Sequence, residues 1–504
     1  MEKFCAKNLL REVNVNHNES VDEENLDPSD WQDMQKLGFQ MVEDMLDYLK
    51  TVRERPVWRP IPDDVKAHFR KPLPQEPEPA EVVYQDFRQN VLPYPLGNIH
   101  PRFWGWVIGT GTPLGMLAEM LAAGMNPNLG GGEHGANYVE SQVLDWCKEM
   151  FGFPEDASGL LVSGGSMANM VGLAVARNFK AGFDIRKQGL SGSSARLTVY
   201  GSHEMHSSIQ KAVELLGLGS DSLRKIAVNS DYQIDLIALQ AVIQEDRARG
   251  YQPICIVGNA GTVNTGAFDD LKALADICQR EELWFHVDGA FGALACLDPE
   301  LCTLIDGMEQ ADSLAFDFHK WMYMPYEVGC ALIRSEDAHR RAFSLTPDYL
   351  THTERGMASG QTWYSDYGLQ LSRGFRALKV WMSLKEHGIR KYQRLMRQNV
   401  EQARYLADLV DCEPQLERLA PVPLNIVCFR YKVDGMNDED LNAFNKELLI
   451  RLQESGMAAP SYTMLNGCYA IRTAITNHRS RREDFEILVK ETIRLGKEMD
   501  REAK

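Results

Sequence analysis

Short apolar runs and stretches of helical spacing alternate along the middle of the chain, from about residue 138 to residue 335. Most of the runs lack the polar alternation of a half-exposed sheet, as expected for parallel strands that are buried on both faces. The predicted strands are Gly159–Ser163, Leu197–Tyr200, Ile254–Gly258, Trp284–Val287, Ser313–Phe318 and Cys330–Ile333. Predicted helices near residues 167–178, 207–217 and 269–281 separate them. This order predicts an α/β domain, residues 99–390, with a mostly parallel central sheet and helices on both faces.

The residues before this domain have a different character. Residues 1–26 are polar and acidic and predict a loose tail. Residues 27–98 begin with a helix-start signal, Asp27-Pro28, followed by apolar side chains at helical spacing. Seven prolines between Arg55 and Pro79 exclude a helix there. Residues 27–98 therefore lack a compact core of their own and need another surface on which to pack.

After the α/β domain, a long helix near residues 367–388 is predicted to lead into a smaller α+β domain, residues 391–504. Its expected strands are Asn425–Arg430 and Tyr469–Ala474, and its expected helices span residues 439–455 and 482–499.

Composition narrows the class of protein. The 504 residues carry a net charge of −17, which disfavours nucleic acid and anionic membranes as partners. No apolar run reaches the roughly 18–20 residues that span a bilayer, and the N-terminus lacks the pattern of a signal peptide. The ten cysteines are scattered without metal-binding spacing, which predicts reduced thiols in the cytoplasm and no metal site.

An aspartate and a lysine end two of the predicted strands. Lys320 follows an apolar run, and a lysine is rarely buried unless its amine is paired or used covalently. The alternative is a lysine whose amine extends to solvent from a strand end. Asp288 ends the other strand, where its carboxylate can pair with the pyridine nitrogen of pyridoxal 5′-phosphate (PLP). Gly289 and Ala290 leave room for a flat ring. The 32 residues between Asp288 and Lys320 fit one strand–helix excursion, and both side chains should face the crevice beyond the strand ends.

A glycine turn follows the first predicted strand. Gly164, Gly165 and Ser166 lie between that strand and a helix, where backbone N–H groups can hold a phosphate. A Gly-Gly-Ser turn is common in proteins, so the prediction of a phosphate site depends on its position directly after the first strand of the parallel sheet. Asn169 is expected to brace this loop.

The sequence His286-Val287-Asp288-Gly289-Ala290 and the later His319-Lys320-Trp321 resemble the group II PLP-dependent amino-acid decarboxylases. This family holds the aromatic-amino-acid, histidine and glutamate decarboxylases. The resemblance runs from about Pro28 to the C-terminus and is strongest to the aromatic branch. It implies a PLP-dependent transferase fold of type I, with PLP covalently bound to Lys320. It also implies a homodimer with the active site at the subunit interface, in which residues 27–98 pack on the partner.

The resemblance also assigns roles to single residues. It selects His206, and not His203, to stack on the cofactor ring opposite Ala290, and places His319 near the phosphate. Thr262 is a candidate to hydrogen-bond the cofactor, and Asp269 is expected to cap a helix. The role of Asp317 stays open, because an acid beside a phosphate must face elsewhere, be bridged or be protonated. The predicted cofactor-binding residues are Gly164, Gly165, Ser166, His206, Thr262, Asp288, Ala290, His319 and Lys320.

The predicted reaction is decarboxylation of an L-amino acid to an amine and CO2. Tyr349 matches the tyrosine of the family's mobile loop, which returns a proton to the α-carbon. Lys320, His206 and Tyr349 are therefore the predicted catalytic residues, while Phe103, Trp104 and Arg373 are predicted to bind the substrate. The aromatic side chains favour an aromatic substrate, although Arg102 could hold the second carboxylate of an acidic one.

Three other activities stay open. An aldehyde synthase on the same scaffold would consume oxygen, an aminotransferase would release a keto acid, and an inactive relative would only bind partners. Residues 130–135, Gly-Gly-Gly-Glu-His-Gly, depart from the pattern of the aromatic-specific members. Arg373 or Arg376 could also serve only to hold the mobile loop.

Overall fold

The computed structural model describes residues 24–192, 195–345, 353–360 and 362–502. It divides into two units, one up to Leu49 and one from Lys50 onward. The predicted proton donor Tyr349 lies outside the described residues.

The first unit contains helix α1 (Trp31–Lys50) up to its last residue but one. The Asp30 carboxylate accepts hydrogen bonds from the backbone N–H of Gln32 at 2.7 Å and of Asp33 at 3.3 Å. Asp30 therefore starts this helix, three residues later than the predicted Asp27-Pro28 signal.

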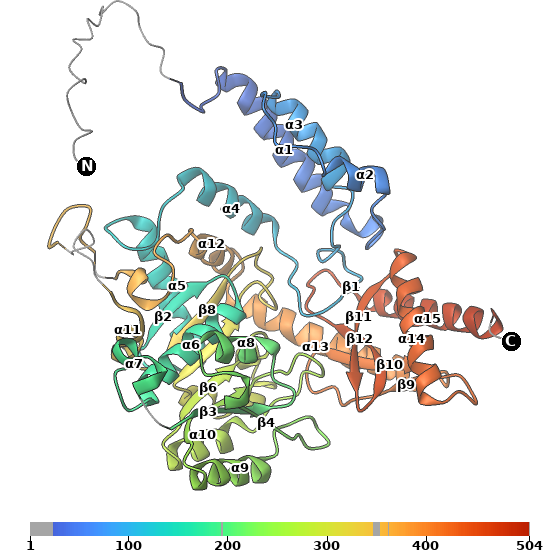
Figure 1. Cartoon of the computed structure of the whole chain (residues 1–504). Helices are drawn as coiled ribbons and strands as arrows, with labels where there is room; N and C mark the ends of the chain where they lie inside the picture. Colours follow the sequence, from blue (N-terminus) through green and yellow to red (C-terminus); the bar gives the residue numbers. More distant parts are fainter. Residues whose placement is uncertain (1–23, 193–194, 346–352, 361, 503–504) are drawn as a thin grey trace, which may run out of the picture. The chain divides into compact units, whose positions relative to one another are not determined.

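A seven-stranded sheet forms the centre of the second unit (Figure 1), in the order β2-β8-β7-β6-β5-β3-β4. Strand β8 runs antiparallel to β2 and β7, so the other six strands point the same way. This confirms the mostly parallel sheet and adds β4, a strand whose polar middle residues the apolar pattern missed. The strands are β2 (Ser158–Val162), β3 (Leu197–Ser202), β4 (Leu223–Ile226), β5 (Gln252–Asn259), β6 (Trp284–Asp288), β7 (Ser313–Asp317) and β8 (Gly329–Ile333).

Helices cover both faces of this sheet, as fold type I requires (Figure 1). Many begin at a side-chain cap, such as Thr112, whose hydroxyl accepts from the Gly115 N–H at 3.1 Å. They are α4 (Pro113–Met125), α5 (Gly135–Phe151), α6 (Gly165–Lys180), α7 (Ile185–Gln188), α8 (Ser207–Leu215), α9 (Leu236–Ala248), α10 (Leu271–Arg280), α11 (Glu336–Phe343) and α12 (Ala377–His387). Between Lys50 and the sheet lie the short helices α2 (Asp63–His68) and α3 (Ala80–Asp86). The prediction that prolines exclude a helix between Arg55 and Pro79 is therefore wrong, because α2 starts directly after Pro62 and contains no proline.

The connection from β6 to β7 differs from the predicted strand–helix excursion. It consists of three 3-10 turns, Gly292–Leu297, Cys302–Ile305 and Met308–Gln310, and the two strands are direct neighbours in the sheet. The strand ends that carry Asp288 and Asp317 therefore lie side by side.

The C-terminal domain has its own sheet, in the order β1-β11-β12-β10-β9, and its own apolar core. Its helices are α13 (Ile389–Cys412), α14 (Asp438–Glu454) and α15 (Arg482–Glu502). Its strands are β1 (Phe103–Trp104), β9 (Leu416–Arg418), β10 (Ile426–Tyr431), β11 (Ala459–Leu465) and β12 (Cys468–Ala474). The long helix predicted near residues 367–388 is shorter and ends at Gly388, whose φ of +68° separates α12 from α13.

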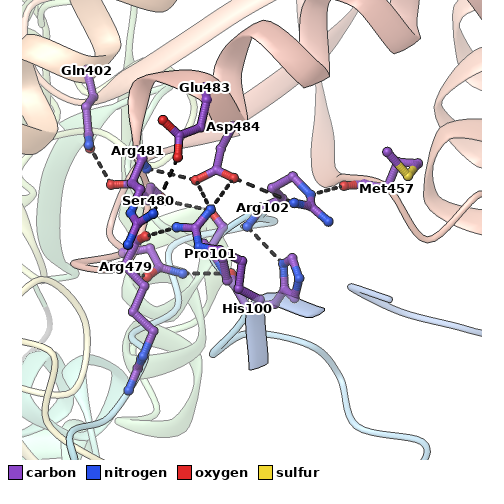
Figure 2. Close-up of polar contacts among 12 residues, drawn as sticks. His100, Pro101, Arg102, Gln402, Met457, Arg479, Ser480, Arg481, Glu483 and Asp484 are labelled. Atoms are coloured by element: carbon purple, nitrogen blue, oxygen red, sulfur yellow. Dashed lines mark hydrogen bonds and ion pairs between the residues drawn. The ribbon is translucent and has the colours of Figure 1, made fainter. Parts of the chain in front are cut away.

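A short segment ahead of the large domain belongs to this smaller domain. Strand β1 pairs in parallel with β11, which places residues 103 and 104 in the C-terminal sheet and not in the large domain. Figure 2 shows how the preceding residues are held: the Ser480 hydroxyl donates to the Pro101 carbonyl at 2.6 Å, and Arg102 Nε donates to the Met457 carbonyl at 2.6 Å. Among the described residues, no helix is both long and apolar enough to cross a bilayer.

Candidate active site

The predicted site residues gather at one edge of the central sheet. Asp288 is the last residue of β6, Asp317 is the last residue of β7, and Lys320 follows three residues later. Gly164 follows β2 at the start of α6, and His206 precedes α8. Because β2, β3, β6 and β7 point the same way, their carboxyl ends meet where α/β sheets bind ligands.

Asp288 is fixed by neutral hydrogen-bond donors. Its carboxylate accepts from Asn169 Nδ2 at 2.9 Å and from the Ala290 backbone N–H at 3.2 Å, and the residue is 5% exposed. Asn169 therefore holds the carboxylate, whereas the sequence suggested that it braces the phosphate loop. A carboxylate held by neutral donors keeps its charge available for a ligand that carries a proton.

A buried histidine orients Asn169 in turn. His286 Nε2 lies 2.9 Å from Asn169 Oδ1, and its Nδ1 lies 2.8 Å from the Ser313 hydroxyl. Complete burial lowers the pKa of His286 to about 4, so the ring is neutral at pH 7. The neutral ring donates to the Asn169 carbonyl oxygen, which leaves the amide of Asn169 free to donate to Asp288.

His206 joins the same network at the start of α8. Its Nδ1 accepts from the Ser208 N–H at 3.2 Å and lies 2.8 Å from the Ser208 hydroxyl, to which Asn169 also donates at 3.0 Å. Burial lowers the pKa of His206, while the nearby carboxylate of Asp288 opposes this shift and the ammonium of Lys320 adds to it. Both charges act on one imidazole, so His206 lies near the two residues that define the predicted cofactor site.

Lys320 is paired and not extended into solvent. Its Nζ lies 2.9 Å from Asp317 Oδ2, and its side chain is 21% exposed. Asp317 itself is 1% exposed and thus faces inward, which excludes the possibility that it points away from the site. The amine is therefore held by Asp317 at the end of β7, the strand next to the one that ends at Asp288.

The glycine turn makes room for these side chains. A Cβ atom on Gly165 would lie 2.8 Å from Asp317 Oδ2, and one on Gly164 would lie 3.0 Å from His319 Cε1. The start of α6 therefore touches Asp317 and His319 directly. Ser166, in the first turn of α6, is exposed.

These residues together fit PLP. The start of α6 offers backbone N–H groups to a phosphate, with His319 beside it. Ala290 lies next to Gly165, 3.4 Å from the position of its added Cβ atom, and leaves a flat surface for a ring. Asp288 supplies the carboxylate for a pyridine nitrogen, and Lys320 supplies the amine.

Two residues of the strand-end loops make local bonds. Thr262 Oγ1 lies 3.0 Å from Thr265 Oγ1 and accepts from the Ala267 N–H at 3.1 Å, so its contact with the cofactor stays a prediction. Asp269 does not cap α10, because the carboxylate of Asp270 accepts from the Ala273 N–H at 2.9 Å. Asp269 is instead buried beneath the loop.

The two aromatic residues predicted to bind the substrate, Phe103 and Trp104, are both buried. Trp104 is 1% exposed, stacks on Phe485 with ring centroids 5.0 Å apart and donates to Ser480, so it has no surface left for a substrate. Phe103 is also buried and packs with Val57 and Ala459 in a small apolar cluster. Trp104 is therefore a structural residue, a correction that follows from the pairing of β1 with the C-terminal sheet. Phe103, although buried, also lines a cavity with Trp106.

Trp106 is the exposed aromatic of this stretch. It is 56% exposed and has a φ of +52°, a backbone conformation that L residues rarely adopt. Three residues later, an added Cβ atom on Gly109 would lie 2.0 Å from the His319 carbonyl oxygen and 2.6 Å from that of Lys320. The loop that carries Trp106 therefore packs directly on the backbone of Lys320.

Side chains from the C-terminal domain hold this loop. Arg472 Nη1 donates to the Trp106 carbonyl at 3.1 Å, and the Thr476 hydroxyl donates to the Ile108 carbonyl at 2.9 Å. Arg479 donates to the carbonyls of Thr110 and Gly111, both at 3.3 Å. Arg472, Thr476 and Arg479 lie more than 350 residues after the loop in the sequence, so local sequence patterns could not predict these contacts.

Arg373 is buried and both of its terminal nitrogens are bonded to protein groups, so it does not fit the substrate-binding role. It is 3% exposed and forms a short ion pair with the buried Glu140. It also donates to the carbonyls of Leu129 and Leu161, each at 2.8 Å. The guanidinium therefore ties the loop at residue 129 to β2, whereas the alternative prediction that it holds the mobile loop stays a prediction.

The loop of residues 130–135 packs on the second half of the predicted mobile loop, which was expected to extend to about Asp366. The Gly130 carbonyl accepts from the Ser365 N–H at 3.0 Å, and the Met357 carbonyl accepts from the Glu133 N–H at 3.2 Å. A Cβ atom on Gly131 would lie 2.2 Å from the Trp363 ring, so the indole needs glycine there. The structure thus gives this loop a packing role.

Comparison with known proteins identifies the family. The description "Pyridoxal-dependent decarboxylase conserved domain" matches residues 62–432. The chain belongs to this family. It is therefore a PLP-dependent carboxy-lyase of fold type I, and the predicted family, fold class and cofactor are confirmed.

Three relatives show how far the similarity extends. An aromatic-L-amino-acid decarboxylase of Bacillus atrophaeus is 33% identical over 464 residues, which cover 91% of this chain and 95% of the relative. A phenylacetaldehyde synthase of Petunia hybrida is 29% identical over 468 residues, which cover 89% of this chain and 91% of the relative. The crystal structure of Oryza sativa TDC with PLP and tryptamine superposes with a TM-score of 0.86 at 26% identity, covering 94% of this chain and all of that chain.

Proposed function

We propose that this protein decarboxylates an aromatic L-amino acid to the corresponding amine and CO2. The proposal rests mainly on the buried carboxylate of Asp288, which Asn169 holds by a hydrogen bond. Asp288 ends β6, and the neighbouring strand β7 leads to Lys320. The names of the Bacillus relative and of the parsley tyrosine decarboxylases, which are 30% identical, support the aromatic substrate.

When PLP is bound, its protonated ring withdraws electrons from the α-carbon of the substrate and so weakens the bond to the carboxylate. Asp288 would keep the ring nitrogen protonated, because its carboxylate lies in an environment of neutral donors. Gly164, Gly165, Ser166 and His319 would hold the phosphate, and Ala290 would support the ring. Thr262 is a further proposed contact, although its described bonds are local.

His206 and Lys320 would complete the catalytic residues around the substrate. With Nδ1 bonded to Ser208, the neutral imidazole of His206 can stack on the ring and use Nε2 toward the substrate carboxylate. Lys320 would bind the cofactor covalently and regain its amine when the product leaves. Tyr349 remains the proposed donor of the proton that replaces the carboxylate.

For the substrate side chain, we propose Trp106 in place of Phe103 and Trp104. Its ring is exposed on a loop that packs against the Lys320 backbone, whereas the other two rings are buried. An acidic substrate held by Arg102 is less consistent with the geometry, because Arg102 Nη1 lies 3.7 Å from the buried Asp484 and its Nε is bonded to a carbonyl. Figure 2 shows Arg102 directed toward these partners.

Assembly and location complete the proposal. We propose a homodimer with the active site at the interface, supported by exposed apolar side chains on α1, among them Trp31 and Phe39. A cytoplasmic location is supported by the free thiols of the cysteines within the described residues.

The experiment that tests the reaction is a product screen. Purified, PLP-loaded protein is supplied with each of the twenty amino acids and with dihydroxyphenylalanine, and products are identified by mass spectrometry. An aromatic amine is the expected product, with at least about 10-fold lower turnover of glutamate. Turnover of glutamate or aspartate alone would contradict the proposal.

A second candidate is aldehyde formation, because the Petunia phenylacetaldehyde synthase is similar over most of the chain. The presence of Tyr349 favours simple decarboxylation, and oxygen uptake separates the two reactions. An aldehyde formed with consumption of oxygen would establish this alternative.

A further inference from the structure

The imidazole of His319, just after β7, has one ring nitrogen bonded and one free. Its Nδ1 accepts a hydrogen bond from the Val328 N–H at 3.0 Å, and burial lowers the pKa of the ring. The proton of the neutral imidazole therefore lies on Nε2. Nε2 is 3.8 Å from Asp317 Oδ2, beyond hydrogen-bond distance, and has no other hydrogen-bond partner among the described residues. This N–H group can therefore donate to a ligand.

The edge of the ring that carries Nε2 faces the glycine turn before α6. A Cβ atom on Gly164 would lie 3.0 Å from His319 Cε1 and 3.7 Å from Nε2. The backbone N–H groups of this turn are the ones that would hold the cofactor phosphate. The orientation of the imidazole thus decides whether Nε2 can take part in phosphate binding.

Tyr326 packs on this imidazole. The two ring centroids are 4.5 Å apart, and the ring planes are inclined by 36°. His319 is 6% exposed and Tyr326 is 48% exposed, so the phenol ring is the member of the pair that meets solvent. A ring in this position restricts the rotation of the imidazole and keeps water from part of its surface.

The hydroxyl of Tyr326 reaches the loop that packs on Lys320. Burial and the charge of Asp317 raise the pKa of Tyr326 to about 12, and a hydrogen bond from the Gly109 N–H opposes this shift. A Cβ atom on Gly109 would lie 2.0 Å from the His319 carbonyl oxygen. Tyr326 therefore contacts the ring of His319 and the loop that covers its backbone.

Both neighbours of Tyr326 in the chain are anchored. A Cβ atom on Gly115, in the first turn of α4, would lie 2.6 Å from Pro325 Cδ, so the proline packs directly on that helix. The Glu327 carboxylate pairs with Arg376 Nη2 at 2.9 Å, just before α12. These contacts fix the backbone of Tyr326, so the place of its ring does not depend on the ring contact alone.

We propose that Tyr326 is a positioning residue for the cofactor phosphate: its ring holds the His319 imidazole with Nε2–H toward the glycine turn and shields this donor from water. A hydrogen bond to a charged group is stronger where water is excluded, so the shield strengthens phosphate binding. The ring contacts His319 and the hydroxyl contacts Gly109, so the two parts of the side chain have separable effects. The inference rests on the assignment of PLP to the site, whereas the packing of Tyr326 on His319 does not.

The test separates the phosphate from the rest of the cofactor. Cofactor-free protein is titrated with PLP and with pyridoxal, which has the same ring and aldehyde but no phosphate, and bound cofactor is measured by its absorbance. Tyr326→Phe keeps the ring and removes the hydroxyl, whereas Tyr326→Leu removes the ring. Tyr251→Leu is the matched control: this partly buried tyrosine precedes β5 at the opposite edge of the sheet, and its ring centroid lies 5.1 Å from Arg224 Cζ.

For Tyr326→Leu we expect the affinity for PLP to fall by about 10-fold, the upper value for the loss of an aromatic pair. Its affinity for pyridoxal should be unchanged, which also shows that the variant is folded at the site. Tyr326→Phe should bind PLP within about 3-fold of the unmodified protein, because the ring is kept. In a His319→Ala background, Tyr326→Leu should cause no further loss, because Tyr326 acts through the imidazole. Tyr251→Leu should match the unmodified protein with both compounds.

A measurement on the cofactor-free protein tests the ring contact itself. Exchange of the His319 Cε1 hydrogen in D2O, followed by mass spectrometry, should be at least about 3-fold faster in Tyr326→Leu and unchanged in Tyr251→Leu. Equal loss of affinity for PLP and pyridoxal would overturn the inference, as would an equal effect of Tyr326→Leu with and without His319. If the unmodified protein binds neither PLP nor pyridoxal, the proposed function itself fails, and the exchange rate still reports on the contact between Tyr326 and His319.

Discussion

At the residue scale, the site depends on neutral groups that hold charged ones. Asp288 accepts hydrogen bonds from Asn169 and from a backbone N–H, and no cation of the described chain is hydrogen-bonded to it. A cation at that position would compete with the protonated pyridine nitrogen for the same carboxylate. Asn169 is the central residue, because it bonds Asp288, Ser208 and His286 at once.

We therefore predict that Asn169→Ala lowers both stability and cofactor affinity. Three buried partners lose a bond, and one unmet buried group costs about 1–3 kcal/mol in the free energy of unfolding. Urea unfolding of the cofactor-free protein measures the loss, and PLP titration measures the affinity. Asn178→Ala, in the same helix but partly exposed, should change neither. Equal behaviour of the two variants would remove Asn169 from its central role.

Single site residues could be predicted where the strand that positions them is adjacent in the sequence. Asp288, Lys320 and the Gly164–Ser166 turn stand next to their own strands, so the strand pattern alone places them at one edge. The contacts of Trp104 and Arg373 are made with Phe485 and Glu140, far away in sequence, so resemblance suggested a substrate role where packing gives a structural one.

At the element scale, buried ion pairs connect loops to the sheet. Arg373 bonds Glu140 of α5 and the carbonyls of Leu129 and Leu161. The pair is almost completely shielded from water, since the side chains are 1% and 0% exposed. Removal of one partner would leave the other charge buried without compensation.

Arg373→Met is predicted to lower the free energy of unfolding by about 3–5 kcal/mol. The double variant Arg373→Met/Glu140→Gln should recover part of this loss, because the uncompensated carboxylate is removed. Arg376→Met is the matched control; its partner Glu327 is half exposed, so the cost should be about 1 kcal/mol or less. A higher KM with unchanged stability would instead restore the substrate-binding role of Arg373.

Most elements of the large domain follow from the apolar pattern, because a buried parallel strand must be apolar on both faces. The pattern failed where an element is short or at an edge. Strand β4 has polar middle residues, of which Lys225 is exposed, and β1 is defined by its pairing with β11, more than 350 residues away. The long helix predicted near residues 367–388 starts only at Ala377, because a 3-10 turn, Tyr364–Tyr367, and an irregular stretch precede it.

At the scale of the whole molecule, buried histidines couple stability to pH. His286 and His339 are completely buried, and burial lowers their pKa to about 4 and about 3. His339 uses both ring nitrogens as a neutral ring does, at 2.8 Å from the Ser158 hydroxyl and at 2.8 Å from the Tyr367 carbonyl. In the unfolded chain both rings titrate near 6.5.

Acid should therefore destabilise the protein before its carboxylates titrate. Below about pH 6.5 these two imidazoles bind protons in the unfolded chain but stay neutral in the folded chain. The free energy of unfolding therefore falls by up to 1.36 kcal/mol per pH unit for each histidine as the pH is lowered. His339→Gln should reduce the slope of stability against pH by about one proton between about pH 6 and pH 4. Denaturant unfolding at several pH values measures this slope, and an unchanged slope would contradict the assignment.

Assembly is the second property at this scale. Helix α1 exposes Trp31, Phe39 and Leu46, with exposed fractions of 66%, 67% and 41%. Apolar side chains of this size at the surface favour a protein interface. Removal of residues 1–49 is predicted to convert a dimer into a monomer in sedimentation velocity and to lower activity. A monomeric full-length protein would contradict the proposed homodimer.

The central claim is that the chain replaces the carboxylate of an aromatic amino acid by a proton. The most direct measurement is the reaction of the PLP-loaded protein with phenylalanine, tyrosine and tryptophan in D2O, with mass spectrometry of the product and an oxygen electrode. We predict an amine that carries one deuterium on the former α-carbon, formed without oxygen uptake. An aldehyde formed with oxygen uptake, or a keto acid, would contradict the account.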